Sequence, residues 1–557
     1  MEQARLLIAI VLSAAVFLVW QFFFVDRDAV QKTAQKSEQP PAKAEPAKPA
    51  QPYTAQQQGE IAKPTPVAEV AVADPAQSAK IFTVETPLYR TKISTKGAGF
   101  VSFILKNYRE EVAEDAPLKE ILPQENFVGT VLIGYDGQSL AGLEDAVFSA
   151  DVDSDTLQVK QGVQKITFAW QSSQGVVVEK TYTFDPASYV MKLAVNVKNG
   201  SDRAIQDKMY ISLRGKVDAK GRTYGFEGPS ALVNDSLEEV EVDDIADKNI
   251  YTGMLKWVAV QDRYFMTSVI PEHAEEATMR LFVNEDNMVE AQFLNALSDI
   301  RPGTQRDYQY ALFFGPRSMK VLKAVGHDLS KALNFGFFDI IAKPCVWLMN
   351  LLYGVIPNYG IAIIVLTLLI KIILWPLGSK SYKSMSEMKR IQPLMKEIRE
   401  KYKDDKKKMN EEVMSLYRTY KINPLGGCLP MLVQLPVFFA LYRMLYQAIE
   451  LRHAPFFLWI DDLSAPDRLF RFPVEHIPFM EPPYGIPVLT LIMGASMILQ
   501  QKMSPPMGDP TQAKMMMFMP VIFTVIFINF SSGLVLYWLV NNILSIAQQY
   551  YIQKKYA

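Results

Sequence analysis

Cysteine and histidine are scarce in this chain, which has 2 Cys and 4 His in 557 residues. Cys345 and Cys428 lie far apart, in or beside apolar segments, so we expect two free thiols and no disulfide framework or zinc site. His273 is the only histidine in the polar central stretch from about Lys80 to Gly315, and no nucleophile elbow, phosphate loop or metal motif accompanies it. The sequence therefore predicts a protein that is not an enzyme and that uses no metal or cofactor.

Acidic residues are missing from the long apolar runs, although the whole chain is nearly neutral, with a formal charge of -1. Hydrophobic residues make up 49% of the sequence, and the mean hydropathy is +0.04. A soluble protein of this length would seldom be so apolar. The surplus lies at the N-terminus and beyond about residue 340, so the pattern predicts a polytopic α-helical membrane protein with a soluble insert.

The N-terminal part contains an apolar run and a polar tether. Leu6 to Val25 is long enough to span a hydrocarbon core of about 30 Å, so we predict a transmembrane anchor over 1–25. A cleaved signal peptide is the alternative, but the run continues without a small-x-small cleavage site. Residues 26–79 are rich in Pro, Ala, Gln and Lys, a composition that predicts a disordered periplasmic linker.

The soluble insert, 80–333, shows the period-two pattern of β-strands. Hydrophobic residues alternate with polar ones over 166–170, 189–197 and 308–314, and Gly, Asn, Asp and Pro bound these stretches. This pattern predicts a large antiparallel β-sandwich. A helical spacing from Ser318 to Leu333 predicts a helix at the end of the domain.

The last part, 334–557, has the composition of a membrane domain. A segment over 337–353 is apolar but contains Asp339, Lys343 and Pro344, and it suits an interfacial helix. With the anchor, the apolar runs predict six transmembrane helices. The five in this domain are at about 359–377, 425–446, 485–500, 515–530 and 534–551.

Charged residues between the apolar runs predict the orientation. The stretch 380–421 is strongly basic, whereas the loop from Arg452 to Tyr484 is mostly acidic. By the positive-inside rule the basic stretch is cytoplasmic and the acidic loop is outside. Both termini are then cytoplasmic, and the β insert is external.

Lys371 is the one ionisable residue well inside a predicted span. Burying such a charge near a helix centre costs roughly 2.5–3.5 kcal/mol, and the charge normally faces a partner or a wet cavity. Snorkelling toward the cytoplasmic interface is an equal alternative from position alone, and it is the better explanation for Arg443 near the external end of its helix. No predicted span contains a carboxylate to pair with Lys371, and this argues against an ion-coupled transporter. An unpaired cation instead favours transient binding of an anionic or strongly polar ligand. Thr367, Gln434 and Asn541 or Asn542 could help to wet such a groove, although helix–helix hydrogen bonds are the commoner use of such residues.

The basic stretch 380–421 predicts a cytoplasmic helical hairpin with a break at Lys403-Asp404-Asp405. Met385, Met388, Met395 and Met409 lie on its apolar stripe, which is either an adaptable client surface or the packing face of the hairpin. Its positive face could contact ribosomal RNA or anionic lipid, but a positive-inside loop needs no such partner.

Four ordered stretches of the membrane domain resemble the YidC family, the bacterial insertases related to the mitochondrial oxidase-assembly and chloroplast proteins. They are NPLGGCLPMLVQLPVFFALYRML (423–445), LRHAPFFLWIDDLSAPD (451–467), QKMSP (501–505) and FMPVIFTVIF with SGLVLYWLV (518–540). The anchor, linker and external domain resemble the Gram-negative form, in which that domain is a periplasmic β-supersandwich similar to sugar mutarotases.

The resemblance implies a five-helix insertase core in the Gram-negative inner membrane. Its hydrophilic groove opens to the cytoplasm and to lipid, and Lys371 takes the place of the groove cation. Clients are nascent membrane proteins, which the family inserts and helps to fold without nucleotide, alone or with the Sec translocon and its accessory subunits. The implied groove and client-contact residues are Thr367, Gln434, Phe438, Met497, Ile526, Tyr537 and Trp538.

Some features depart from the family. Lys371 stands where Arg is usual, which keeps the charge but loses the planar fork. Trp538 and Ile526 replace aromatic residues common in relatives, Ser531 stands where Pro is frequent, and no long basic tail follows the last span. Contact with the ribosome or the signal-recognition machinery is therefore the weakest implication. The alternatives are a polytopic transporter or channel, which would show intramembrane charge pairs or repeats, and a membrane-anchored carbohydrate-binding protein, which would favour a His and carboxylate set in the β insert.

Overall fold

The computed structural model describes residues 79–557 except 125–126, 153, 218–224, 285–287, 421–428, 475, 504–509 and 557. The described residues belong to one compact unit, Ala71–Ala557. The predicted anchor over 1–25, almost all of the predicted linker over 26–79, and Cys428 lie outside the described residues.

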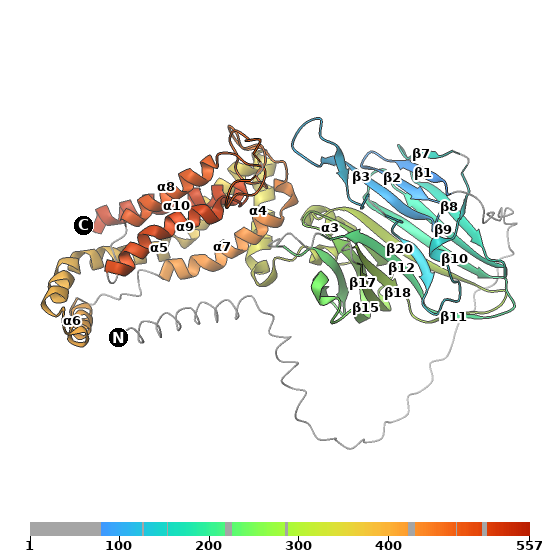
Figure 1. The fold of residues 1–557 in the computed structure, drawn as a ribbon, viewed down its shortest axis with the longest axis horizontal. Helices are drawn as coiled ribbons and strands as arrows, with labels where there is room; N and C mark the ends of the chain where they lie inside the picture. The colour runs from blue at the N-terminus through green and yellow to red at the C-terminus, as the bar shows by residue number, and fades with distance from the viewer. Residues whose placement is uncertain are drawn as a thin grey trace, which may run out of the picture. The chain divides into compact units, whose positions relative to one another are not determined.

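Residues from Ile81 to Pro316 form the β domain, which consists of three sheets (Figure 1). The strands are β1 (Ile81–Glu85), β2 (Tyr89–Ser94), β3 (Gly99–Arg109), β4 (Leu118–Glu120), β5 (Leu132–Tyr135), β6 (Ser149–Ala150), β7 (Thr156–Gln158), β8 (Gln164–Gln171), β9 (Val176–Phe184), β10 (Val190–Asn199), β11 (Ile205–Asp207), β12 (Met209–Lys216), β13 (Gly228–Val233), β14 (Ser236–Glu239), β15 (Ile250–Gln261), β16 (Phe265–Pro271), β17 (Glu275–Val283), β18 (Met288–Leu294), β19 (Ser298–Ile300) and β20 (Gln305–Pro316). The five-stranded sheet has the order β4-β3-β2-β1-β7. A 13-stranded sheet has the main path β5-β12-β18-β17-β15-β16-β20-β10-β9-β8-β6, and β11 pairs with β19.

The two larger sheets face each other across one hydrophobic core. Phe82 of β1 contacts Phe168 of β8 edge-to-face, with ring centroids 5.8 Å apart, and Phe103 of β3 contacts Phe314 of β20 at 5.2 Å. Pairing is antiparallel except between β1 and β7. The alternating segments predicted as strands lie in β8, β10 and β20, with their hydrophobic residues turned to this core. The predicted sandwich is therefore observed.

The helix predicted to run from Ser318 to Leu333 is interrupted. The α-helix α3 (Met319–Val325) begins after Ser318, whose side chain accepts a hydrogen bond from the Val321 amide, and a short 3₁₀ turn over Leu329–Ala332 follows it. Three residues in a row, Gly326, His327 and Asp328, have positive φ angles of 81°, 49° and 57°. A left-handed backbone cannot continue an α-helix, so the expectation of one helix was wrong.

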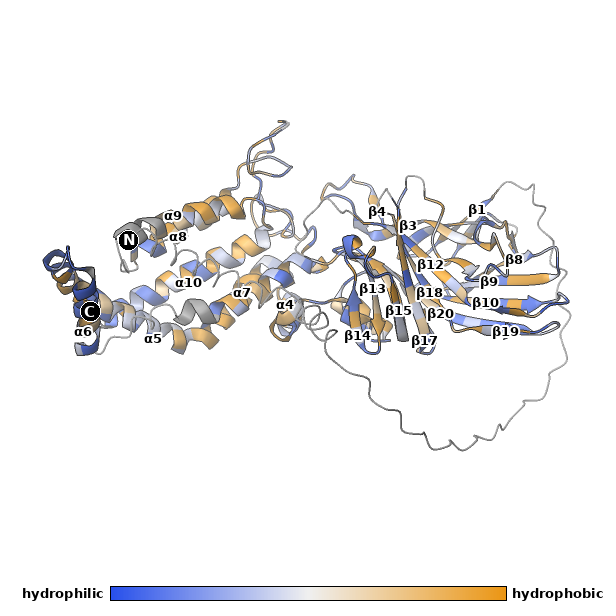
Figure 2. Cartoon of the chain, turned by 60° about the horizontal axis from the view of Figure 1, so that its bottom comes forward, coloured by the Kyte–Doolittle hydropathy of each residue, from blue (hydrophilic) through white to orange (hydrophobic). Residues whose placement is uncertain are grey.

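The helical region begins with α4 (Asp339–Val355) and α5 (Tyr359–Lys401) and continues with α6 (Lys406–Thr419), α7 (Leu429–Gln447), α8 (Val488–Met503), α9 (Pro510–Phe527) and α10 (Ser532–Tyr556). The sequence separates a span over 359–377 from a hairpin over 380–421, but α5 is continuous across that boundary and contains Pro376 and Pro393. The hairpin therefore continues a membrane helix. Figure 2 shows that α7 and α9 are largely hydrophobic, whereas α6 is mostly hydrophilic.

By length and composition, two of the described helices are able to cross a membrane: Gly336–Val355 and Tyr359–Lys401. Two shorter helical segments, Val488–Met503 and Met516–Phe527, are also apolar. One hydrophobic cluster joins the helices to part of the β domain and includes Trp257 of β15 and Phe313 of β20. The candidate site lies among α5, α7, α8, α9 and α10.

Candidate functional site

The side chain of Lys371 connects α5 to α10 by a hydrogen bond. Its Nζ donates a hydrogen bond to the Ser545 hydroxyl, with the two atoms 2.8 Å apart, and this hydroxyl donates to the Asn541 carbonyl oxygen at 2.7 Å. Among the described residues no carboxylate lies within ion-pair distance of Lys371. The ammonium group is therefore held between two helices by a neutral partner, a position that snorkelling does not require.

Ser545 belongs to a polar stripe on α10. Its members recur at helical spacing and have buried side chains: Asn541, Asn542, Ser545, Gln548 and Gln549. The Asn542 amide donates to the Ser496 hydroxyl of α8 at 3.1 Å, and the Gln548 amide donates to the Trp375 carbonyl of α5 at 3.1 Å. Such bonds are the usual ties between membrane helices.

The stripe also contains unused polar groups. Neither the nitrogen nor the oxygen of the fully buried Gln549 amide has a hydrogen-bond partner among the described residues. Unsatisfied buried polar groups are rare in folded proteins. The contact between α5 and α10 therefore contains a lysine without a carboxylate partner among the described residues, and α10 also carries an unpaired buried amide.

Aromatic side chains gather on α7, α9 and α10. The Trp538 ring contacts Phe438 with centroids 4.7 Å apart, and it contacts Phe527 at 5.1 Å. Gln434 and Tyr537 are joined by a side-chain hydrogen bond. Four of the residues that the resemblance implied are thus brought together: Gln434, Phe438, Tyr537 and Trp538.

The other implied groove residues lie elsewhere. Thr367 is buried, and its hydroxyl donates to the Ile363 carbonyl of its own helix at 2.7 Å. Met497 of α8 packs half-buried against the helical core, and Ile526 of α9 is 51% exposed. Thr367 therefore has no free hydroxyl proton in this conformation, and Ile526 belongs to the apolar outer surface of the helices.

The hairpin uses its methionines for packing. Met388 and Met395 are buried with Ile391, and Val413, Leu416 and Tyr417 of α6 pack against them. Met385 is also buried, whereas Met409 of α6 is half-buried. For Met388 and Met395 the closed hairpin favours the packing alternative over a client surface.

Arg443 of α7 lies against the segment that leads into α4. A Cβ atom at Gly336 would lie 2.6 Å from Nη1 of Arg443, and Gly336 has a φ of +66°. The left-handed backbone and this close approach both favour glycine at this position. Arg443 therefore packs on the backbone at the start of α4, and snorkelling is not needed to explain it.

The β domain contains no comparable set of reactive groups. No group of three or more His, Cys, Asp or Glu side chains in the described part of the chain could hold a metal ion. Its buried Lys180 donates to the carbonyl oxygens of Gly97, Ala98 and Val131 at 2.8–2.9 Å, and burial lowers the pKa of Lys180 to about 7. These acceptors are all backbone, so we interpret Lys180 as structural.

Sequence reasoning found Lys371 but not its partners. Ser545, Gln548 and Gln549 were missed as a group, although their spacing with Asn541 places all four on one face of a helix. That spacing was the signal that could have identified them.

Two family models match the chain and together cover most of it. The model described as "YidC periplasmic domain" matches residues 81–348, and the model described as "60Kd inner membrane protein" matches residues 351–557. A membrane protein insertase YidC from Syntrophus aciditrophicus is 41% identical over 99% of both chains, and one from Syntrophobacter fumaroxidans is 39% identical over 99% of this chain and 100% of that protein. The chain belongs to the YidC family of membrane protein insertases.

Solved structures are more distant from the chain. An active YidC insertase with its first transmembrane domain resolved is 20% identical, covers 86% of this chain and 95% of that chain, and has a TM-score of 0.37. A galactose mutarotase related enzyme from Lactobacillus acidophilus is 12% identical over 42% of this chain and 97% of that chain, with a TM-score of 0.30. The curated YidC relatives are named as insertases and not as enzymes.

Proposed function

We propose that this chain inserts integral proteins into the inner membrane and helps them to fold, through a hydrophilic groove open to the cytoplasm and lipid. The observation that carries the proposal is the Lys371 ammonium group, held by the Ser545 hydroxyl with no carboxylate within ion-pair distance among the described residues. Family membership and the names of the relatives support it. A transporter would need a charge pair here, and nothing favours that alternative.

The site performs insertion by electrostatics and hydration, without bond chemistry. A half-buried cation without a carboxylate within ion-pair distance among the described residues lowers the free energy of an acidic or strongly polar client segment at the same depth. The Gln549 amide, on the same helix as Ser545, has hydrogen-bonding capacity that no described residue uses. The client's apolar segment gains free energy on entering lipid, so it leaves the groove while the polar segment crosses.

We propose six transmembrane helices, with both termini cytoplasmic and the β domain periplasmic. The anchor would be 1–25 and the linker 26–79, followed by the β domain over 80–333 and the insertase core over 334–557. An interfacial position for 337–353 is supported by Asp339, Lys343 and Pro344 within α4, and the described helices α5, α7, α8, α9 and α10 supply five spans.

The proposed partners follow from this activity. Nascent membrane proteins and the phospholipid bilayer are the essential ones. The Sec translocon with its accessory subunits is a further proposed partner. The ribosome or signal-recognition machinery would contact the basic face of the hairpin formed by α5 and α6, because Met388 and Met395 occupy its interior.

Site-specific photocrosslinking to ribosome-stalled clients tests the proposed route. We expect adducts from probes at positions 371 and 538, and a weaker adduct from the buried position 367. Position 373, two residues from Lys371, is the matched control because Ile373 is 73% exposed on another face of α5. Equal adducts from 371 and 373 would show that clients follow the outer surface and not the groove.

A further inference from the structure

The loop between α7 and α8, residues 448–487, presents three apolar tips outward. Leu458 is 91% exposed, Phe470 69% and Phe479 80%. Each has a left-handed backbone, with φ angles of 60°, 51° and 64°. Bulky residues rarely adopt this conformation, because their side chains clash with the backbone there. The loop thus accepts backbone strain at the positions of its three most exposed large apolar side chains.

Buried polar contacts fix the loop beneath these tips. The Asp467 carboxylate accepts hydrogen bonds from the amides of Leu489 and Thr490 at the start of α8. The Arg468 guanidinium donates to the carbonyl oxygens of Pro483 and Ile528, both at 2.8 Å. The tips are therefore carried on a defined scaffold that is attached to α8 and to the end of α9.

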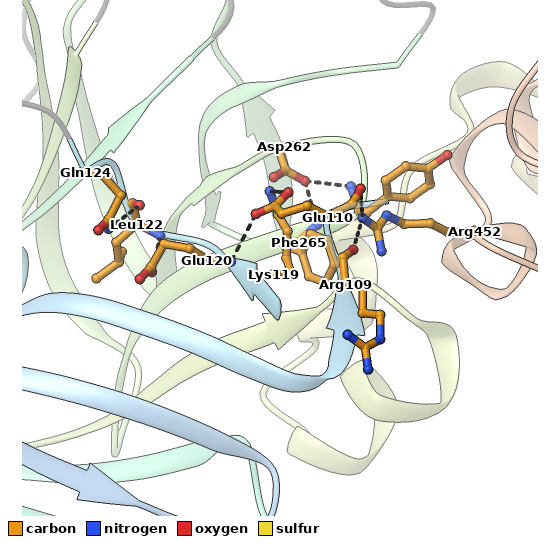
Figure 3. A network of polar contacts seen from close by, with 10 residues as sticks. Arg109, Glu110, Lys119, Glu120, Leu122, Gln124, Asp262, Phe265 and Arg452 are labelled. Atoms are coloured by element: carbon orange, nitrogen blue, oxygen red, sulfur yellow. Dashed lines mark hydrogen bonds and ion pairs between the residues drawn. The ribbon is translucent and has the colours of Figure 1, made fainter. Parts of the chain in front are cut away.

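The loop is also attached to α10 and to the β domain. The Ser532 hydroxyl donates to the Asp462 carbonyl oxygen at 2.7 Å, at the start of α10. Arg452 donates to the carbonyl oxygens of Arg109 and Glu110, where β3 turns toward β4 (Figure 3). Contacts from both sides hold the loop in place, so its exposed side chains are set by the fold.

The inner and outer sides of the loop are distinct. Phe456 packs inward over the start of α5, where a Cβ atom at Gly360 would lie 2.0 Å from its ring. Leu458, two residues later, points away from the protein. On the outside, the exposed apolar surface continues on the first turn and a half of α8 with Leu491 and Ile492. The three tips therefore continue the exposed apolar surface of α8 beyond the beginning of that helix.

We propose that Leu458, Phe470 and Phe479 enter the boundary between headgroups and acyl chains of the outer leaflet and anchor the periplasmic ends of α7 and α8 in lipid. The side of the membrane rests on the orientation proposed above. Leu and Phe side chains are among those that interfacial segments bury at this boundary, because removing apolar surface from water is favourable.

The charge of the loop favours apolar insertion over attraction to anionic lipid. It contains six acidic residues and three basic ones: Glu450, Asp461, Asp462, Asp467, Glu475 and Glu481 against Arg452, Arg468 and Arg471. A net charge of -3 repels an anionic surface, so binding must come from apolar burial and should change little with salt.

Depth-dependent fluorescence quenching tests the anchor. The full-length protein with Cys345→Ser and Cys428→Ser would carry one new cysteine, labelled with bimane, at 458, 470 or 479, in phosphatidylcholine vesicles with spin-labelled lipids. Leu297→Cys is the matched control, because Leu297 is an equally apolar side chain that is 68% exposed in the β domain. We expect quenching by shallow spin labels to be at least about twofold stronger at the three tips than at 297, with reduced quenching by aqueous iodide.

Equal quenching at the tips and at 297 would overturn the proposal. Protection of the tips only in native membranes, and not in pure lipid vesicles, would also overturn it and would assign the patch to a protein partner. The readout needs no client, so a failed insertion assay would refute the proposed function and leave this result standing.

Discussion

Replacing Lys371 by an apolar residue should make the protein more stable and less active. In Lys371→Met the half-buried charge disappears, which relieves up to roughly 2.5–3.5 kcal/mol of insertion cost. Loss of the hydrogen bond to Ser545 offsets roughly 1.5–3 kcal/mol of that gain. The Ser545 hydroxyl keeps its acceptor, the Asn541 carbonyl, so the substitution leaves no new orphan donor. We expect a net stabilisation of about 1 kcal/mol.

The assay is the midpoint of detergent-induced unfolding of the full-length protein, measured beside insertion of a single-span client with an acidic external tail in vesicles. Lys380→Met is the matched control, because Lys380 is an exposed lysine on the same helix. It should change stability by less than about 0.5 kcal/mol. A Lys371→Met protein that is less stable than the parent, or that is as active, would refute the idea of a lysine retained for function at a cost in stability.

Three further predictions concern the scaffold. Burial would raise the pKa of Asp207, but hydrogen bonds from the Gly137, Ser139 and Lys208 amides hold it below its usual value. A lowered folded-state pKa stabilises the β domain above about pH 4, and this stabilisation is lost as the pH falls. The Asp207→Asn protein should therefore be less stable at neutral pH. In denaturant titrations its free energy of unfolding should also fall less on acidification than that of the parent. Asn199→Ala removes the amide that donates to the Arg203 and Ile300 carbonyls and should cost roughly 2–4 kcal/mol, measured by the same titrations; a loss below 0.5 kcal/mol would mean that water replaces it. Asp467→Ala should destabilise the start of α8 by roughly 1–2 kcal/mol, seen as faster amide hydrogen exchange at Leu489 and Thr490 and unchanged exchange in the β domain.

Much of the fold could be predicted because its elements have strong local signals. Alternation over 166–170, 189–197 and 308–314 corresponds to β8, β10 and β20, since a strand with one buried face must alternate. The α5 helix was divided in the prediction because its hydrophobicity falls after residue 377. That change marks the edge of an apolar environment and not the end of a helix.

The site was harder to predict because its partners are far apart in sequence. Lys371 is conspicuous as a lone charge, but Ser545 lies 174 residues away and a serine in a helix is unremarkable. The roles of the methionines in the hairpin depended on which face α6 covers, a tertiary fact that periodicity does not contain. The exposed tips of the 448–487 loop were hidden in an acidic segment, because exposure and backbone handedness cannot be read from composition.

The most direct test of the central claim is the insertion rate of two matched clients that differ only in the charge of the external tail. Lys371→Arg should preserve insertion of both clients, and Lys371→Glu should slow the client with an acidic tail about tenfold while leaving the client with a neutral tail nearly unchanged, because one like charge in a groove costs on the order of 1.4 kcal/mol. Lys380→Glu, the same reversal on an exposed part of α5, should affect neither client. Insertion of the acidic client at the normal rate by Lys371→Glu would contradict the account.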